Sequence, residues 1–237
     1  MAVDTPEGAV TGSARLEAPG WLEILTGGAT YAAAFLLVAV LLPLVEDPAV
    51  HGIVGLVVSG AMGLVAFSAA VLVRIRGLSA FGIRRAKPRH LVVAALLGVA
   101  AYVLGTVAAI VYMVVSGDTQ NVQTSYQAAA AGGWWSLAFA IIAGAVLTPL
   151  GEEAFFRGVL ANAFLARYKA WIAVLASAAI FAVAHGINPV LPVAFVVGVL
   201  TALLFRWSGS IWPGVLLHGV NNATALLVPL LVTRAGV

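Results

Sequence analysis

The sequence contains no cysteine and few charged residues. Without cysteine, the protein has no disulfide, no thiolate metal site and no cysteine nucleophile. Only 9% of the 237 residues are charged and 62% are hydrophobic, whereas about 25% of the residues of a soluble domain are charged. Because so few charges cannot cover a water-exposed surface, lipid must solvate much of the exterior. Strand-length alternation of apolar and polar residues is also missing, which disfavours a membrane β-barrel.

Long apolar runs predict the fold. About 20 apolar residues cross a bilayer as a helix, and seven candidate spans approach this length. They cover approximately residues 30–45, 53–73, 91–116, 134–165, 171–185, 190–205 and 211–232. The fourth is too long for one plain span, so we expect it to leave the hydrocarbon near Arg157 or to continue along the interface. The sequence predicts an all-α, polytopic transmembrane helical bundle of about seven spans, within a range of six to eight.

Basic residues set the expected orientation. The loop 74–90 is rich in Lys and Arg, which are enriched in cytoplasmic loops. Counting spans outward places the N-terminus in the cytoplasm and the C-terminus outside. We expect residues 1–28 to form a cytoplasmic N-terminal tail, and residues 29–237 an integral membrane domain with a motif-bearing core at 134–232. A multi-pass cell-membrane location follows, and the Ala-, Gly- and Val-rich composition favours a prokaryotic plasma membrane. The basic residues act as topology signals, so we expect no nucleic-acid partner.

The first polar cluster inside the spans lies at residues 151–158. Ionisable residues within membrane helices cost about 2.5–3.5 kcal/mol each, so their default interpretation is functional. Glu153 and Arg157 are four residues apart, in the order that favours an ion pair on a helix. Glu152 projects roughly 100° away from Glu153 and lacks a local cation, which suits a general base or acid. In the alternative interpretation, both acids are solvated at the interface and Arg157 is an interfacial anchor.

Two histidine motifs follow. His185 ends a Phe-x-x-x-His segment that begins at Phe181, and a single histidine there is also compatible with simple packing. His218 and Asn222 are four residues apart and share one helix face, where they could equally join two helices by hydrogen bonds. Taken together, one carboxylate, two histidines and one amide supply the groups that activate water and bind an oxyanion.

Other hydrolase signatures are missing from the sequence. No histidine begins a His-Glu-x-x-His motif, which excludes the usual zincin arrangement. All three aspartates lie outside the expected spans, which excludes an aspartyl dyad, and there is no Gly-x-Ser-x-Gly elbow. The candidate chemistry therefore centres on Glu152.

These motifs resemble the CPBP family, which takes in CAAX-processing endopeptidases and bacteriocin-processing or self-immunity proteases, also called Abi proteins. The resemblance rests on Glu-Glu-x-x-x-Arg at 152–157, Phe-x-x-x-His at 181–185 and His-x-x-x-Asn at 218–222, in that order. It implies a conical helical bundle with a cavity open to the membrane and the cytosol. By this likeness Glu152, helped by His185, would activate the attacking water. His218 and Asn222 would stabilise the oxyanion. Three residues would support the site: Glu153, Arg157 and Phe181.

The role of a metal stays open at this point. The family has been described both as metalloprotease and as glutamate protease. Glu152, His185 and His218 could hold Zn²⁺ with one open position, but Glu152 would then be a ligand and could not serve as the base. Because Arg157 is expected to occupy Glu153, the remaining carboxylate nearby, we favour the scheme without a cofactor.

The sequence therefore predicts an intramembrane endopeptidase of the CAAX-protease type, which hydrolyses a peptide bond of a prenylated or leader peptide. Its expected partners are a membrane-associated peptide or protein substrate and the lipid bilayer. The main alternative is a non-catalytic membrane protein, an immunity factor or scaffold. A proton-coupled transporter is disfavoured because the sequence shows no inverted repeat.

Overall fold

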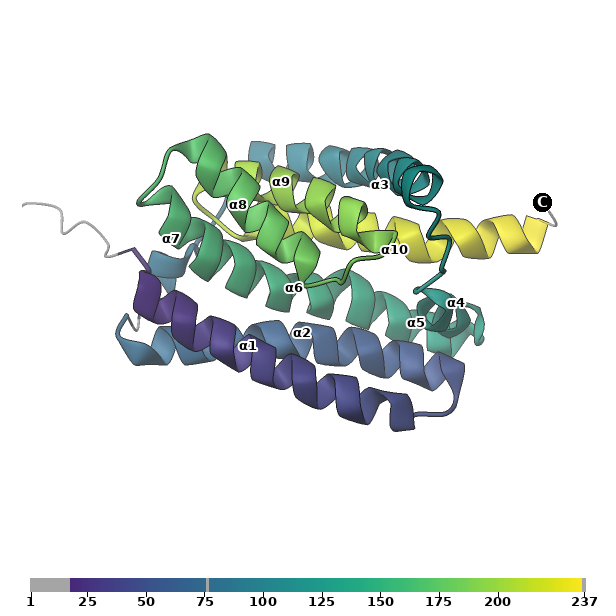
Figure 1. The fold of residues 1–237 in the computed structure, drawn as a ribbon. Coiled ribbons are helices and arrows are strands. Elements are labelled where there is room, and N and C mark those ends of the chain that lie inside the picture. The colour runs from purple at the N-terminus through teal and green to yellow at the C-terminus, as the bar shows by residue number, and fades with distance from the viewer. Residues whose placement is uncertain (1–17, 76, 236–237) are drawn as a thin grey trace, which may run out of the picture.

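The computed structural model describes residues 18–75 and 77–235. In this part of the chain all regular secondary structure is helical, and no strand occurs. Six helices are long and apolar enough to cross a membrane, and a further apolar helix is shorter. The helices run back and forth along a common direction (Figure 1). The prediction of an all-α, polytopic bundle of about seven spans is therefore confirmed.

The first two helices form an antiparallel pair. Helix α1 (Trp21–Leu41) is followed by the short turn η1 (Leu42–Leu44) and then by α2 (Pro48–Val73), and the two long helices pack together. Helix α1 begins well before the expected span because the Glu23 carboxylate accepts the Gly20 N–H at 2.6 Å and an Arg74 N–H at 2.9 Å. Residues 21–28, which were expected in the cytoplasmic tail, are thus helical. Residues 1–17 of that tail lie outside the described residues.

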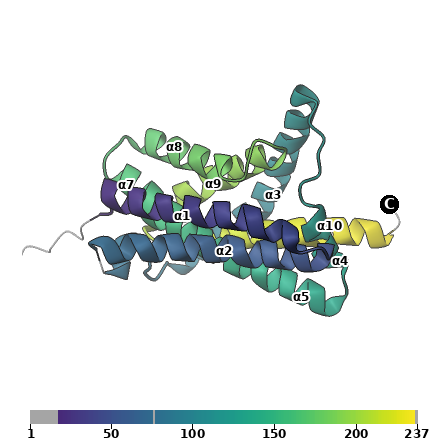
Figure 2. The ribbon, with the colours of Figure 1, turned by 60° about the horizontal axis from the view of Figure 1, so that its bottom comes forward.

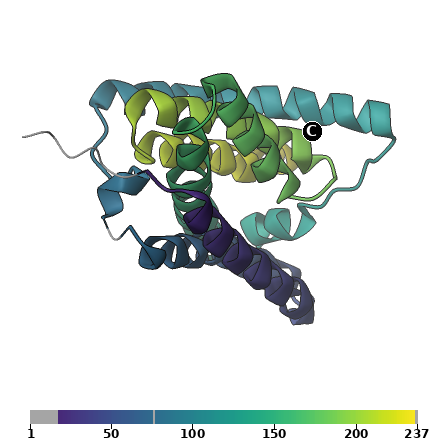
Figure 3. The same cartoon turned by 60° about the vertical axis from the view of Figure 1, so that its left-hand side comes forward.

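The middle of the chain crosses between two groups of helices. After η2 (Leu78–Phe81), helix α3 (Pro88–Ser116) packs against α9 (Val190–Ser208) and α10 (Trp212–Ala235). The chain then leaves α3 and reaches α4 (Thr124–Ala131), which packs against α2. Figure 3 shows this connection descending from α3 to the side of α1 and α2. It spans one end of the bundle.

Residues 134–165 form one continuous helical segment. It consists of α5 (Trp134–Ile142), α6 (Thr148–Glu153) and α7 (Asn162–Leu165), joined by the π-helical turns η3 (Ala143–Leu147) and η4 (Ala154–Ala161). π-Helical turns occur frequently at functional sites. That this segment leaves the hydrocarbon near Arg157, or continues along the interface, stays a prediction. Arg157 itself is only 1% exposed, because protein groups surround and pair its guanidinium.

The last three helices complete the bundle. Helix α8 (Ala170–Val183) is short and packs on α9, and α10 packs on both α3 and α9. Figure 2 shows α8 and α9 on one side of the molecule, with α1 and α2 on the other and α10 extending beyond them. Large apolar side chains remain exposed along the spans, such as Val103 at 55% and Val107 at 55% on α3. Such a surface suits contact with lipid.

Candidate functional site

Glu152 on α6 is at the centre of the site. It is 2% exposed, and its Oε1 accepts a hydrogen bond from Ser59 Oγ on α2 at 2.7 Å. Its Oε2 lies 3.8 Å from His185 Nε2 and 3.9 Å from His218 Nε2. Both separations exceed a direct hydrogen bond. The structure therefore brings both predicted histidines to the same oxygen of the predicted base.

Glycines allow α6 to approach α2 closely enough for the bond from Ser59. A Cβ on Gly60 would lie 2.5 Å from the Leu147 carbonyl oxygen, and one on Gly151 would overlap the Gly60 carbonyl group. A Cβ on Gly63 would likewise meet the Gly151 backbone. Small residues let membrane helices come into backbone contact. This contact places Glu152 beside Ser59, a residue that sequence reasoning missed because a lone serine in an apolar span is common.

His185 lies in the turn just after α8. Its Nδ1 is 2.9 Å from the Phe181 carbonyl oxygen, one turn back, so Nδ1 carries the hydrogen and donates it. In the neutral imidazole, Nε2 is then an acceptor directed toward Glu152. Asn188 fixes the turn, because its Nδ2 donates to the His185 carbonyl at 2.8 Å and its Oδ1 accepts from Val190 N–H at 2.8 Å.

His218 on α10 is oriented by the second glutamate. It is 4% exposed, and its Nδ1 lies 3.2 Å from Glu153 Oε1. With Nδ1–H donated to that carboxylate, Nε2 faces Glu152. Glu153 thus contacts a predicted site residue directly, in addition to the Arg157 that was expected to pair with it.

Glu153 and Arg157 form a buried ion pair one helical turn apart. Arg157 Nε lies 3.1 Å from Glu153 Oε2 and donates to Thr201 Oγ1 on α9 at 2.7 Å. The guanidinium carbon sits 4.4 Å from the centre of the Phe181 ring. Phe181 also contacts His185 and His218, with ring centres 4.7 and 5.8 Å apart. The three supporting residues therefore pack directly beneath the two histidines.

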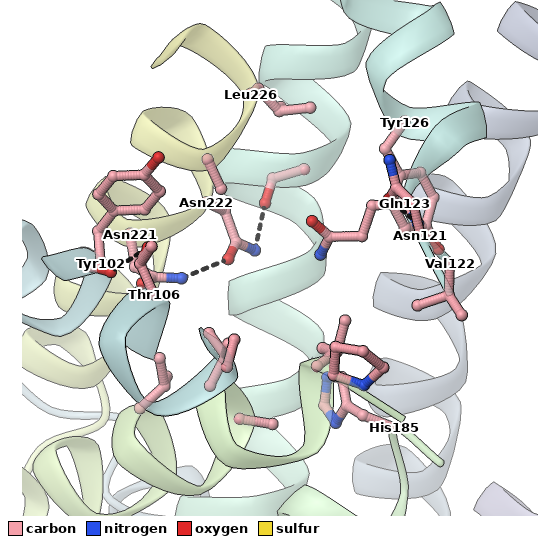
Figure 4. A pocket seen from close by; sticks show the side chains of 18 of the residues that line it. Tyr102, Thr106, Asn121, Val122, Gln123, Tyr126, His185, Asn221, Asn222 and Leu226 are labelled. Atoms are coloured by element: carbon pink, nitrogen blue, oxygen red, sulfur yellow. Dashed lines mark hydrogen bonds between the residues drawn. The ribbon is translucent and has the colours of Figure 1, made fainter. Parts of the chain in front are cut away.

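Asn222 is held one turn beyond His218 on α10. Its Nδ2 donates to the Gly144 carbonyl at 2.9 Å, and its Oδ1 accepts from Asn221 Nδ2 at 3.1 Å (Figure 4). One N–H of the Asn222 amide remains for a further acceptor. Asn221 is a second residue that sequence reasoning missed.

All four predicted catalytic residues line one cavity of about 490 Å³. Figure 4 shows Asn221 and Asn222 on one side of it, Gln123 and Tyr126 opposite, and His185 below. Burial, and to a smaller extent the charge of Glu152, raises the pKa of Tyr126 above its ordinary value. Its hydroxyl therefore stays neutral and can donate a hydrogen bond. Tyr126 was missed because α4 lies outside the apolar spans.

The donor types at this site match those of catalytic zinc, but their spacing is wider. Ligands about 2.0–2.2 Å from a tetrahedral Zn²⁺ lie about 3.3–3.6 Å from one another. Glu152 Oε2 is 3.8 and 3.9 Å from the two imidazole nitrogens. Among the described residues, no group of three or more His, Cys, Asp or Glu side chains is placed to hold a metal ion. The scheme without a cofactor stays a prediction.

The fold and site define a polytopic helical membrane protein with a glutamate and two histidines around an internal cavity. Residues 134–224 match the family model described as type II CAAX prenyl endopeptidase Rce1-like. The predicted resemblance to the CPBP and CAAX protease family is thereby confirmed over these residues, which carry all three motifs. The match covers less than half of the chain.

One curated relative is an Escherichia coli protein described as "Uncharacterized 24.3 kDa protein". It is 37% identical over 87 residues, which make up 35% of this chain and 40% of the relative. The similarity thus spans less than half of the relative's length. No solved structure matches the chain.

Proposed function

We propose that this protein is an intramembrane endopeptidase that uses Glu152 to activate water. One observation carries the proposal: in the cavity, one oxygen of Glu152 lies within 3.9 Å of two imidazole nitrogens whose opposite nitrogens are both engaged. These separations leave room for a water molecule that hydrogen-bonds to the carboxylate and to an imidazole. A general base needs this reach to the proton that it removes.

The chain's own residues divide the work of peptide hydrolysis. Glu152 takes a proton from water while the water oxygen bonds to the scissile carbonyl carbon, and His185 Nε2 accepts the second water proton in a hydrogen bond. The carbonyl oxygen becomes an oxyanion, which His218 Nε2–H and the remaining Asn222 N–H stabilise. As the C–N bond breaks, Glu152 returns its proton to the leaving amine.

Glu153 serves this scheme as a positioning residue. Its carboxylate lies 3.2 Å from His218 Nδ1, so it holds the imidazole with Nε2 toward Glu152 and the scissile carbonyl. Arg157 holds Glu153 in place from the other side. The arrangement resembles the logic of a catalytic triad, in which a carboxylate orients the working imidazole. The substrate in this proposal is a membrane-associated peptide or protein.

The test compares membrane-associated peptides in cells that produce the wild type or Glu152→Gln, quantified by mass spectrometry. Gln keeps an acceptor for Ser59 but cannot take the proton, so uncleaved precursors should accumulate, with cleavage reduced about 10²–10⁴-fold. Glu46→Gln is the matched control, because Glu46 is exposed and lies outside the cavity. Identical peptides in the wild type and Glu152→Gln would contradict the proposal and favour a non-catalytic immunity or scaffold protein. Loss of cleavage on adding a chelator would instead favour Zn²⁺ at this site.

A further inference from the structure

Charge divides the two ends of the bundle. The start of α1, the connection from α2 to α3 and the turns before α8 and α10 lie at one end, here called the basic end (Figure 1). The described basic residues at this end are Arg74, Arg84, Arg85, Lys87, Arg89, Arg167, Lys169 and Arg206. At the opposite end the described charges are Glu46, Asp47, Asp118 and Arg234. By the positive-inside rule, the basic end faces the cytoplasm.

The cavity is closed toward the basic end. Below His185 and His218, Phe181 packs edge-on against Phe156 with ring centres 4.9 Å apart. Arg157 stacks on the same Phe181 ring and bonds to Thr201 on α9. Phe156, Phe181, Arg157 and Thr201 are each no more than 2% exposed. This layer separates the site from the basic end.

The cavity opens toward the opposite end. Three helices form its walls, and each contributes residues from the half of the helix that is farther from the basic end. These residues are 102–113 of α3, 190–197 of α9, and Leu56 and Ser59 of α2. The connection 119–123 and the start of α4 line its mouth. Figure 4 shows Asn121 and Gln123 facing Asn222 across the cavity. Residues 119–122 of this connection are exposed, so the cavity is accessible from this side.

The mouth is neutral. The side chains that line it are amides and hydroxyls, namely Thr119, Gln120, Asn121, Gln123, Tyr126 and Gln127. Amides both donate and accept, which suits the backbone of an extended peptide. Among the described residues that line the cavity, none is lysine or arginine. A free terminal carboxylate would therefore meet no lysine or arginine there.

We infer that the substrate is an uncharged segment of an exported or membrane-inserted polypeptide, which reaches the site from the non-cytoplasmic face of the membrane. This inference rests on the proposed peptidase function. It differs from the cytosolic opening that the family resemblance implied, and it excludes a prenylated tail presented from the cytosol.

The absence of native cysteine makes the test direct. Single-cysteine variants are treated with a membrane-impermeant maleimide in intact spheroplasts and again after permeabilisation, with total thiol measured in denaturant. Gln120→Cys tests access to the mouth, and Thr106→Cys tests access to the cavity wall. Ala166→Cys tests access to the basic end and removes no charge. All three positions are exposed. Thr119→Cys replaces Gln120→Cys if that variant does not accumulate. We expect near-complete labelling of Gln120→Cys and Thr106→Cys in intact spheroplasts, and of Ala166→Cys only after permeabilisation.

The reverse pattern would overturn the inference, and so would protection of Thr106→Cys while Gln120→Cys reacts. Labelling needs no activity, so it is independent of the peptide comparison with Glu152→Gln. Unchanged peptides together with the expected labelling would refute the peptidase alone. Accumulating precursors together with reversed labelling would refute the orientation alone.

Discussion

At the scale of single residues, Glu152 and Glu153 are neighbours in the chain with opposite surroundings. The helical rotation between them directs Glu153 toward Arg157 and His218, and Glu152 toward Ser59 and the cavity. Glu153 compensates a buried cation, whereas Glu152 pairs with no lysine or arginine in the described part of the chain. The two acids should therefore respond differently to the same substitution.

Glu153→Gln should lower the stability of the protein. It leaves the Arg157 guanidinium, which is 1% exposed, without its carboxylate. Removing one partner of a buried ion pair costs about 3–5 kcal/mol. Thermal unfolding in detergent micelles measures the effect, and Glu152→Gln is the matched control, because Glu152 pairs with no lysine or arginine among the described contacts. Equal melting temperatures for Glu153→Gln and the wild type would contradict this account of the pair.

At the scale of elements, the contact between α2 and α6 decides where Glu152 lies. Ser59 and Glu152 are 93 positions apart in sequence and meet only because Gly60, Gly63 and Gly151 bring the two backbones together. Apolar length predicted both helices, but the sequence carries no signal for this pairing. The short helix α8 is a second case, because its early end at Val183 brings His185 into the bundle interior.

Gly63→Ala should push α6 away from α2 and impair both folding and cleavage. A Cβ there overlaps the backbone at Gly151, and backbone cannot move aside as a flexible side chain can. Overpacking costs typically about 1–3 kcal/mol, and displacement of Glu152 adds a loss of turnover. Gly28→Ala on α1 is the control, because a Cβ at Gly28 has nothing within 4 Å. Melting temperature and cleavage rate should both fall for Gly63→Ala and stay unchanged for Gly28→Ala. Wild-type values for Gly63→Ala would show that α2 and α6 can separate without consequence.

At the scale of the whole molecule, the exterior is built for lipid and the polar groups are gathered inside. Glu152, Glu153, Arg157 and His218 are each no more than 4% exposed, while valines and leucines cover the surface of the spans. The bilayer thereby replaces the charged surface that the composition lacks.

This arrangement predicts a depth-dependent cost for a charge on the lipid face of α3. Val103 is 55% exposed near the middle of α3, and Val115 is 82% exposed at its end. Arginine at the middle of a span costs about 2.5–3.5 kcal/mol on insertion scales, whereas a long cationic side chain at a helix end reaches the interface. Val103→Arg should reduce the membrane-integrated fraction, measured by carbonate extraction, and Val115→Arg should not. Equal integration of the two variants would place Val103 away from lipid.

The sequence by itself determined the class of protein, the helical spans and the three motifs. The length of an apolar run and the i, i+4 spacing of residues on a helix are both local properties of a chain. Only the tertiary structure decided that Ser59 bonds to Glu152, that Glu153 orients His218, and that Arg157 is buried against Phe181 and Thr201. It also decided toward which end the cavity opens. These features depend on contacts between distant segments and on how closely glycines allow helices to approach, and neither is encoded in the spacing of residues along one helix.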